Sequence, residues 1–72
     1  MKKSYKIEVD CAACANKMEA AAAKVAGVQS VVVNYLLQKI VVEFAEDSDP
    51  QAVMRDILRT CRRIEPDCEI EF

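Results

Sequence analysis

The chain has 72 residues, 53% of them apolar, and a formal net charge of −2. That length accommodates one domain, and the composition is typical of a globular protein rather than a disordered one. We therefore expect residues 1–72 to form a single domain, and the slightly negative charge argues against a nucleic-acid partner, which would require a basic face.

The first half of the chain predicts a strand followed by a helix. Residues 3–9 alternate between apolar and charged side chains, which is the pattern of a half-buried strand. Residues 12–25 are rich in Ala, Lys and Glu, all strong helix formers, with Cys14 and Met18 on one face. Gly27, the only glycine, is expected to end this helix as a C-cap residue.

The middle of the chain predicts a β-hairpin. Val28–Asn34 is rich in β-branched residues, and residues 39–45 place Ile40, Val42 and Phe44 on one face. The few residues between these segments suggest a tight connection, although they lack an Asn-Gly turn signal.

The last third predicts a second helix and a final strand. Asp49 is a candidate N-cap residue and Pro50 a candidate first helical residue. Pro66 is expected to end the helix, and residues 67–72 again alternate as a strand does. The apolar stripe of the helix comprises Val53, Ile57, Cys61 and Ile64, and the inward face of the final strand comprises Cys68, Ile70 and Phe72.

The order of these elements, βαββαβ, predicts an α+β ferredoxin-like sandwich. Right-handed crossovers place both helices on one face of a four-stranded antiparallel sheet with strand order 4-1-3-2. Three connections then share one end of the molecule: the loop after the first strand, the hairpin turn, and the segment from Glu65 to Asp67.

The sequence contains no segment that predicts membrane insertion or export. No apolar run approaches the ~20 residues that a transmembrane helix requires, and the start MKKSYKIEVD lacks the apolar stretch of a signal peptide. We therefore expect the reducing cytosol, where cysteines act as metal ligands or catalytic thiols more often than they form disulfides. The chain has no histidine, so a metal ion would be held by sulfur and oxygen.

Two cysteines, Cys11 and Cys14, stand at the expected start of the first helix. A helix N-terminus offers unpaired N–H groups and a positive dipole end, and both favour thiolate over thiol. A two-residue spacer lets both sulfurs turn toward one ion, and the chain has no second CxxC motif to complete a structural zinc site. This pattern predicts an open metal site at the surface, with a redox-active thiol pair as the main alternative.

The chain as a whole resembles a heavy-metal-associated domain, the small βαββαβ module of soft-metal P-type ATPases and of copper chaperones. The resemblance is carried by DCAAC after the first strand, ANKME in the helix, GVQSVVVN, and KIVVEF. Copper members usually carry Gly-Met before x-Cys-x-x-Cys, whereas Glu8, Val9 and Asp10 precede Cys11 here. An aspartate at this position, and the ending RRIEPDCEIEF, resemble the branch that handles zinc, cadmium and lead.

Charge counting supports a divalent ion independently of the resemblance. Two thiolates, one carboxylate and a divalent ion sum to −1, whereas the same ligands around Cu(I) sum to −2. Two sulfur ligands are sufficient to coordinate Cu(I), whereas zinc accepts additional oxygen ligands. We therefore predict Asp10, Cys11 and Cys14 as ligands of Zn(II), Cd(II) or Pb(II), in preference to Cu(I).

Two other side chains are additional candidate ligands. Cys68 begins the last strand beside the end of the first, and Glu65 lies in a connection at the same end of the molecule. The alternatives are a core cysteine and a solvated carboxylate, respectively.

The resemblance implies a role in metal export. We expect the N-terminal metal-binding domain of a metal-exporting P-type ATPase, positioned on the cytoplasmic side of the cell membrane, that delivers the ion or regulates the pump. The domain would be monomeric and not an enzyme, its partners would be the transmembrane and cytosolic domains of the parent ATPase, and that parent would be an ATP-driven translocase. The alternatives are a free-standing metallochaperone of the copper or mercury type and a CxxC thiol–disulfide oxidoreductase.

Overall fold

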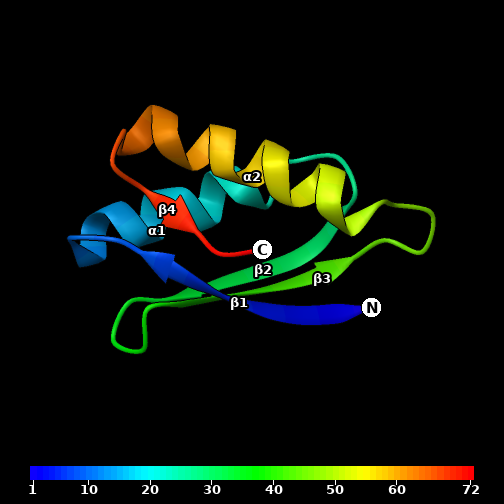
Figure 1. Ribbon diagram of the computed structural model, residues 1–72, viewed down its shortest axis with the longest axis horizontal. Helices are drawn as coiled ribbons and strands as arrows, with labels where there is room; N and C mark the ends of the chain where they lie inside the picture. Colours follow the sequence, from blue (N-terminus) through cyan, green and yellow to red (C-terminus); the bar gives the residue numbers. More distant parts are fainter.

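The computed structural model describes all 72 residues and has the element order βαββαβ (Figure 1). It confirms the ferredoxin-like fold. Neither helix combines the length and the apolar composition needed to cross a membrane. The elements are β1 (Lys2–Glu8), α1 (Ala12–Ala22), β2 (Val28–Asn34), β3 (Lys39–Phe44), α2 (Pro50–Ile64) and β4 (Glu69–Ile70).

The four strands form one sheet in the order β2-β3-β1-β4, with every neighbouring pair antiparallel. This is the predicted order, and both helices cover the same face of the sheet (Figure 1). β2 is therefore an edge strand. Glu19 of α1 reaches this edge, where its Oε2 accepts a hydrogen bond of 2.8 Å from the Val33 amide.

The core lies between the sheet and the helices and contains no polar or charged side chain apart from thiols. It forms because the period-two apolar residues of the strands face the apolar stripes of both helices. The largest fully buried members are Phe44, Ile7, Met18, Ile40, Met54 and Ile57.

The predicted start of α2 is confirmed. Asp49 is its N-cap residue, with Oδ1 accepting a hydrogen bond of 3.1 Å from the Gln51 amide. Pro50 is the first helical residue, where its missing N–H costs no hydrogen bond. The helix ends at Ile64, two residues before Pro66.

The predicted C-cap of α1 is wrong. The helix ends at Ala22 with Ala23 as its C-cap, and two further turns separate it from β2. Gly27 lies in the second of these turns with φ +90°, in the region that favours glycine. A Cβ at this position would approach Cγ2 of Val53 to 2.7 Å, so the glycine also permits close packing against α2.

The final strand is shorter than predicted. Only Glu69 and Ile70 pair with β1, although the Glu71 amide still donates a hydrogen bond of 2.9 Å to the Lys6 carbonyl. Cys68 and Ile70 are buried as expected, but Phe72 lies beyond the end of β4 and is 41% exposed.

Candidate metal site

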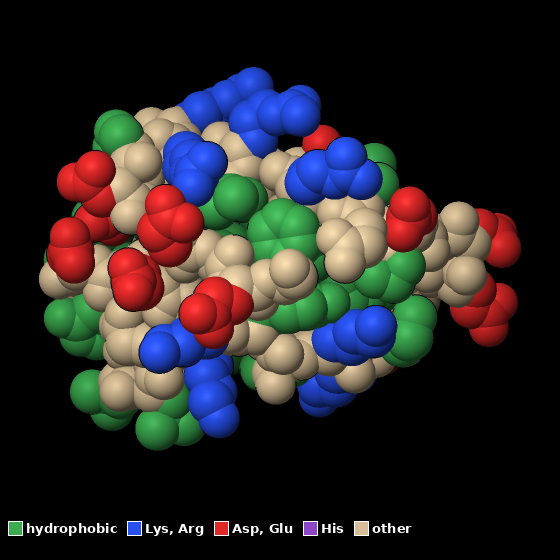
Figure 2. Space-filling view, viewed as in Figure 1, with side chains coloured by type: hydrophobic (Ala, Val, Ile, Leu, Met, Phe, Trp, Pro, Cys, Tyr) green, Lys and Arg blue, Asp and Glu red, His purple; other side chains and the backbone are tan.

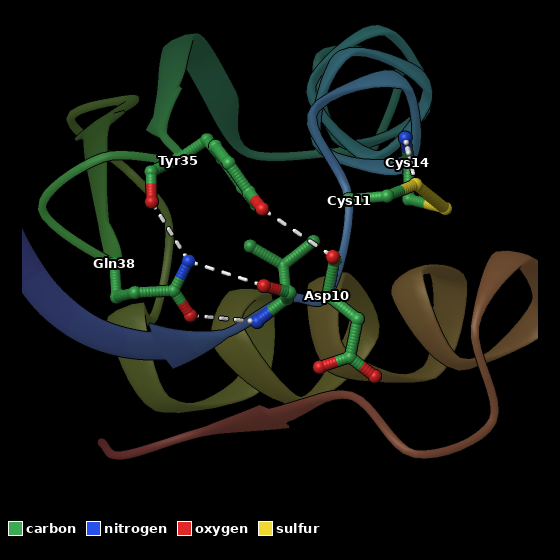
Figure 3. The surroundings of a disulfide bond; sticks show 6 residues. Asp10, Cys11, Cys14, Tyr35 and Gln38 are labelled. Atoms are coloured by element: carbon green, nitrogen blue, oxygen red, sulfur yellow. Dashed lines mark hydrogen bonds between the residues drawn. A yellow bond between two sulfur atoms is a disulfide. The ribbon is translucent and has the colours of Figure 1, made fainter.

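The cysteine pair is built on the start of α1. Cys11 is the N-cap residue and Cys14 lies in the first turn, with their Cα atoms 5.2 Å apart and their sulfurs joined as a disulfide (Figure 3). The Cys14 amide donates a hydrogen bond of 3.0 Å to the Cys11 sulfur, as it would to the side chain of a serine or aspartate cap. After reduction, the same N–H group and the helix dipole favour the Cys11 thiolate.

Both cysteines are accessible from outside. Each is half-buried, and Cys14 packs against the edge of the core. The spacer residues Ala12 and Ala13 are exposed and small, so they leave the sulfurs uncrowded. Once reduced, such a pair can both accept an ion and release it.

Asp10 and Glu65 bring two carboxyl groups together beside this pair. Asp10 is exposed, and Figure 3 shows its carboxylate turned away from the two sulfurs. Glu65 follows α2, and the neighbouring Asp10 carboxyl raises the pKa of Glu65, first by hydrogen bonding to its protonated form and also by charge repulsion. Its Oε2 atom is shielded from solvent and has no hydrogen-bond donor around it.

Cys68 lies in the core rather than at the surface. It is fully buried, as is its neighbour Cys61 on α2. The hydrogen bond with Cys68, together with burial, raises the pKa of the Cys61 thiol, which consequently stays protonated. The structure thus brings Asp10 close to Glu65, and pairs Cys68 with Cys61.

The candidate ligands form separate pairs. No three or more Cys, Asp or Glu side chains converge closely enough to surround a metal ion. The sulfur pair and the carboxyl pair nevertheless flank the same loop, because Asp10 immediately precedes Cys11.

Figure 2 shows acidic side chains at the end of the molecule where α2 connects to β4 and also at the opposite end, where β3 connects to α2. Asp10, Glu65 and Asp67 belong to the loops at the first of these ends. Beyond them the hairpin turn exposes apolar side chains, of which Leu36 is the most exposed at 90%. Asp10, Glu65 and Asp67 place negative charge around the loop that precedes the cysteines, and negative charge attracts cations.

One residue that contacts this loop escaped the sequence analysis. Gln38, in the turn between β2 and β3, hydrogen-bonds through its side chain to the backbone of Val9 (Figure 3). A glutamine in a short turn has no spacing or periodicity that would indicate such a contact, so no sequence signal could have found it.

The fold and site define a class: a ferredoxin-like domain with an accessible cysteine pair at a helix N-terminus. Within this class, the sequence profile of the "Heavy-metal-associated domain" matches residues 4–66. The chain belongs to the heavy-metal-associated domain family.

Its relatives include N-terminal domains of P-type ATPases. A 41-residue stretch is 51% identical to the "Probable copper-transporting ATPase PacS" of Synechocystis, covering 57% of this chain and 6% of that protein. The solved N-terminal domain of PacS from Synechocystis is 29% identical with a TM-score of 0.69, over 99% of this chain and 94% of that one.

Two further solved structures are similar over nearly the whole chain. One, described under "Crosstalk between Cu(I) and Zn(II) homeostasis", is 30% identical with a TM-score of 0.75, covering 99% of this chain and 96% of that one. The Cu(I)-loaded N-terminal domain of a potential copper-translocating P-type ATPase from Bacillus subtilis is 26% identical with a TM-score of 0.75, covering 99% and 84%. The chain is thus a heavy-metal-associated domain similar to the N-terminal domains of P-type ATPases.

Proposed function

We propose that residues 1–72 act as a single domain that captures Zn(II), Cd(II) or Pb(II) for an exporting P-type ATPase. Cys11, Cys14 and Asp10 supply the ligands, and Glu65 is a further oxygen donor. The observation that carries this proposal is the pair of carboxyl groups beside the cysteine loop, one of which has a shielded oxygen without a partner.

Oxygen donors next to a sulfur pair favour a divalent ion. Zinc takes four ligands and accepts carboxylate oxygen, whereas Cu(I) is satisfied by two soft sulfurs. With the same three ligands, the complex of a monovalent ion also carries one more net negative charge than the complex of a divalent ion. A divalent cation near Asp10 and Glu65 would neutralise their repulsion and give the Glu65 oxygen its missing partner.

The site is suited to transfer rather than to permanent storage. The sulfurs are accessible at the start of α1, so an incoming thiolate or carboxylate can replace one ligand at a time. The disulfide form of Cys11 and Cys14 offers no thiolate and must be reduced before an ion can bind. Transfer therefore takes place in a reducing compartment.

The partners follow from the same proposal. The ion passes to the transmembrane and cytosolic parts of the parent ATPase, on the cytoplasmic side of the membrane, or its presence regulates them. The domain works as a monomer and catalyses nothing itself, because ATP-driven translocation belongs to the parent.

A second candidate function is Cu(I) binding, which the names of several relatives favour. PacS is named as a copper-transporting ATPase, and the Bacillus subtilis domain was solved with Cu(I) bound. In a Cu(I) domain the two sulfurs would suffice, and neither Asp10 nor Glu65 would contribute to affinity.

Competition titration of the reduced domain with Zn(II), Cd(II), Pb(II) and Cu(I) separates the two functions. We expect Glu65→Gln to weaken binding of the divalent ions severalfold and to leave Cu(I) unchanged. Asp67→Asn is the matched control, because it removes an exposed carboxylate from the same connection. Cu(I) binding by the two thiolates that outcompetes every divalent ion, with no effect of Glu65→Gln on any of the metals, would support the copper function instead.

A further inference from the structure

The pairing between β1 and β3 ends just before the cysteine loop. Lys6 and Lys39 form the last register pair, and the Ile7 amide donates a hydrogen bond of 3.0 Å to the Gln38 carbonyl. Val9, two residues after Ile7, would need the next backbone partner on the β3 side of β1. At this point the segment before β3 has already turned into the hairpin, so it offers no backbone partner.

The Gln38 side chain supplies that partner. Its Oε1 accepts a hydrogen bond of 2.9 Å from the Val9 amide, and its Nε2 donates one of 3.1 Å to the Val9 carbonyl (Figure 3). The carboxamide thus makes the two hydrogen bonds that an opposite residue of an antiparallel strand would make. Val9 is only 4% exposed, so its backbone groups would otherwise be poorly satisfied.

We propose that Gln38 is a positioning residue of the metal site, which fixes the backbone from which Asp10 and Cys11 project. The expected effect on metal affinity rests on the proposed function. The two hydrogen bonds between the Gln38 side chain and the Val9 backbone, which form a clamp on that backbone, can be tested without metal.

The backbone of Gln38 supports a role for its side chain. Its φ is +53°, in the left-handed region, and it is the only residue other than glycine with a positive φ. Glycine or asparagine adopts this conformation more easily, so a long side chain held there points to a function of that side chain.

The same turn holds the carboxamide and the loop at two further points. Nε2 of Gln38 also donates a hydrogen bond of 2.8 Å to the Tyr35 carbonyl, which fixes the carboxamide from its own side. The Tyr35 hydroxyl donates a longer bond of 3.4 Å to the Asp10 carbonyl (Figure 3). Both residues that precede Cys11 are therefore tied to the hairpin turn.

This clamp matters most for the oxygen ligand. A ligand loop held in one conformation loses less entropy when it binds an ion, so its affinity is higher. The sulfurs are also fixed by α1, whereas Asp10 depends on the segment between Val9 and the helix. Loosening the clamp should therefore weaken binding of divalent ions more than binding of Cu(I).

The test uses Gln38→Asn, which separates the side chain from the backbone. Asparagine is one methylene shorter and cannot reach Val9, yet it suits the positive φ. We expect at most a small loss of thermal stability, because the easier backbone conformation offsets part of the lost hydrogen bonds. Amide exchange at Val9 should be ~10-fold faster, beyond what that loss accounts for, and alkylation of Cys11 in the reduced apo domain should also be faster. Zn(II) affinity should fall by ~3–10-fold, with Cu(I) affinity nearly unchanged.

Gln29→Asn on the exposed part of β2 is the matched control and should change none of these quantities. Gln38→Gly, which also suits the positive φ, should repeat the effect of Gln38→Asn. Unchanged exchange at Val9 in both variants would overturn the inference, as would faster exchange that merely follows a loss of global stability. If the wild-type domain bound no divalent ion, the proposed function would fail, while exchange at Val9 would still decide the role of Gln38.

Discussion

The backbone groups at the two ends of the molecule find their hydrogen-bond partners in different ways. At the end far from the cysteines, backbone groups pair with one another: the Phe44 amide donates to the Met1 carbonyl at 2.7 Å, and the Ala45 amide to the Gly27 carbonyl at 2.8 Å. At the cysteine end, side chains take over this task, with Gln38 holding Val9.

This contrast separates stability from binding. The far end satisfies its backbone groups by backbone pairing and by short-range caps from Ser48 and Asp49, and it packs Gly27 closely against α2. The cysteine end keeps thiols accessible and leaves a carboxyl oxygen without a partner, at some cost in stability. Substitutions at the far end should therefore change the free energy of unfolding, and those at the cysteine end should change metal binding.

The largest effect on binding is expected from the thiols. Cys11→Ser or Cys14→Ser should each weaken binding of every soft metal by more than about 100-fold, because loss of a primary ligand exceeds the 10–100-fold typical of an outer contact. Titration of the reduced variants measures this, with a thermal melt of the apo form as the control. Tight binding by either variant would show that the ion lies elsewhere.

Gly27→Ala should have the largest effect on stability. The positive φ and the close approach of the new Cβ to Val53 should together cost about 2–4 kcal/mol of unfolding free energy. Urea denaturation measures this cost, and metal affinity of the folded fraction should not change. The double variant with Val53→Ala should recover the steric part relative to Val53→Ala alone. An unchanged urea midpoint would contradict the contrast between the two ends.

Asp10→Ala sharpens the comparison at the cysteine end. We expect Zn(II) affinity to fall by ~10–100-fold, and Cu(I) affinity to stay the same or rise because a negative charge has gone. The two affinity ratios, variant over wild type, should be measured in one reducing buffer. Equal ratios for the two metals would mean that Asp10 does not choose between them.

Cys61→Ser should have a smaller effect, limited to stability. It places a hydroxyl in the core next to Cys68, which should cost about 1–2 kcal/mol. Cys61→Ala serves as the apolar comparison, and a urea titration with parallel metal binding checks both. Loss of metal binding in Cys61→Ser with the fold intact would place this thiol in the metal site.

The sequence predicts this fold well because its signals are local. The alternation in β3 and the Asp49–Pro50 start of α2 act within a few residues, so they can be recognised without the tertiary structure. The end of α1 and the length of β4 were predicted less well. Gly27 is required by its contact with Val53, and the pairing of β4 with β1 at only two residues is a tertiary feature that the alternation pattern does not specify.

The candidate site was predictable only in part. The spacing of Cys11 and Cys14 indicates a shared site, and the topology brings Glu65 to the same end as Asp10. That their carboxyl groups are neighbours depends on how α2 meets the sheet, which no local pattern specifies. The contact of Gln38 depends on the strand register and on where the hairpin turns, so it emerges only from the structure.

The hydrogen bond from Val33 to Glu19 has a consequence for self-association. β2 is an edge strand of seven residues, and such an edge is a template on which another chain can add a strand. The Glu19 carboxylate already occupies the Val33 amide, so an incoming strand would have to displace a charged acceptor at that position. A helix side chain thereby protects the exposed edge of the sheet against intermolecular β-pairing and aggregation.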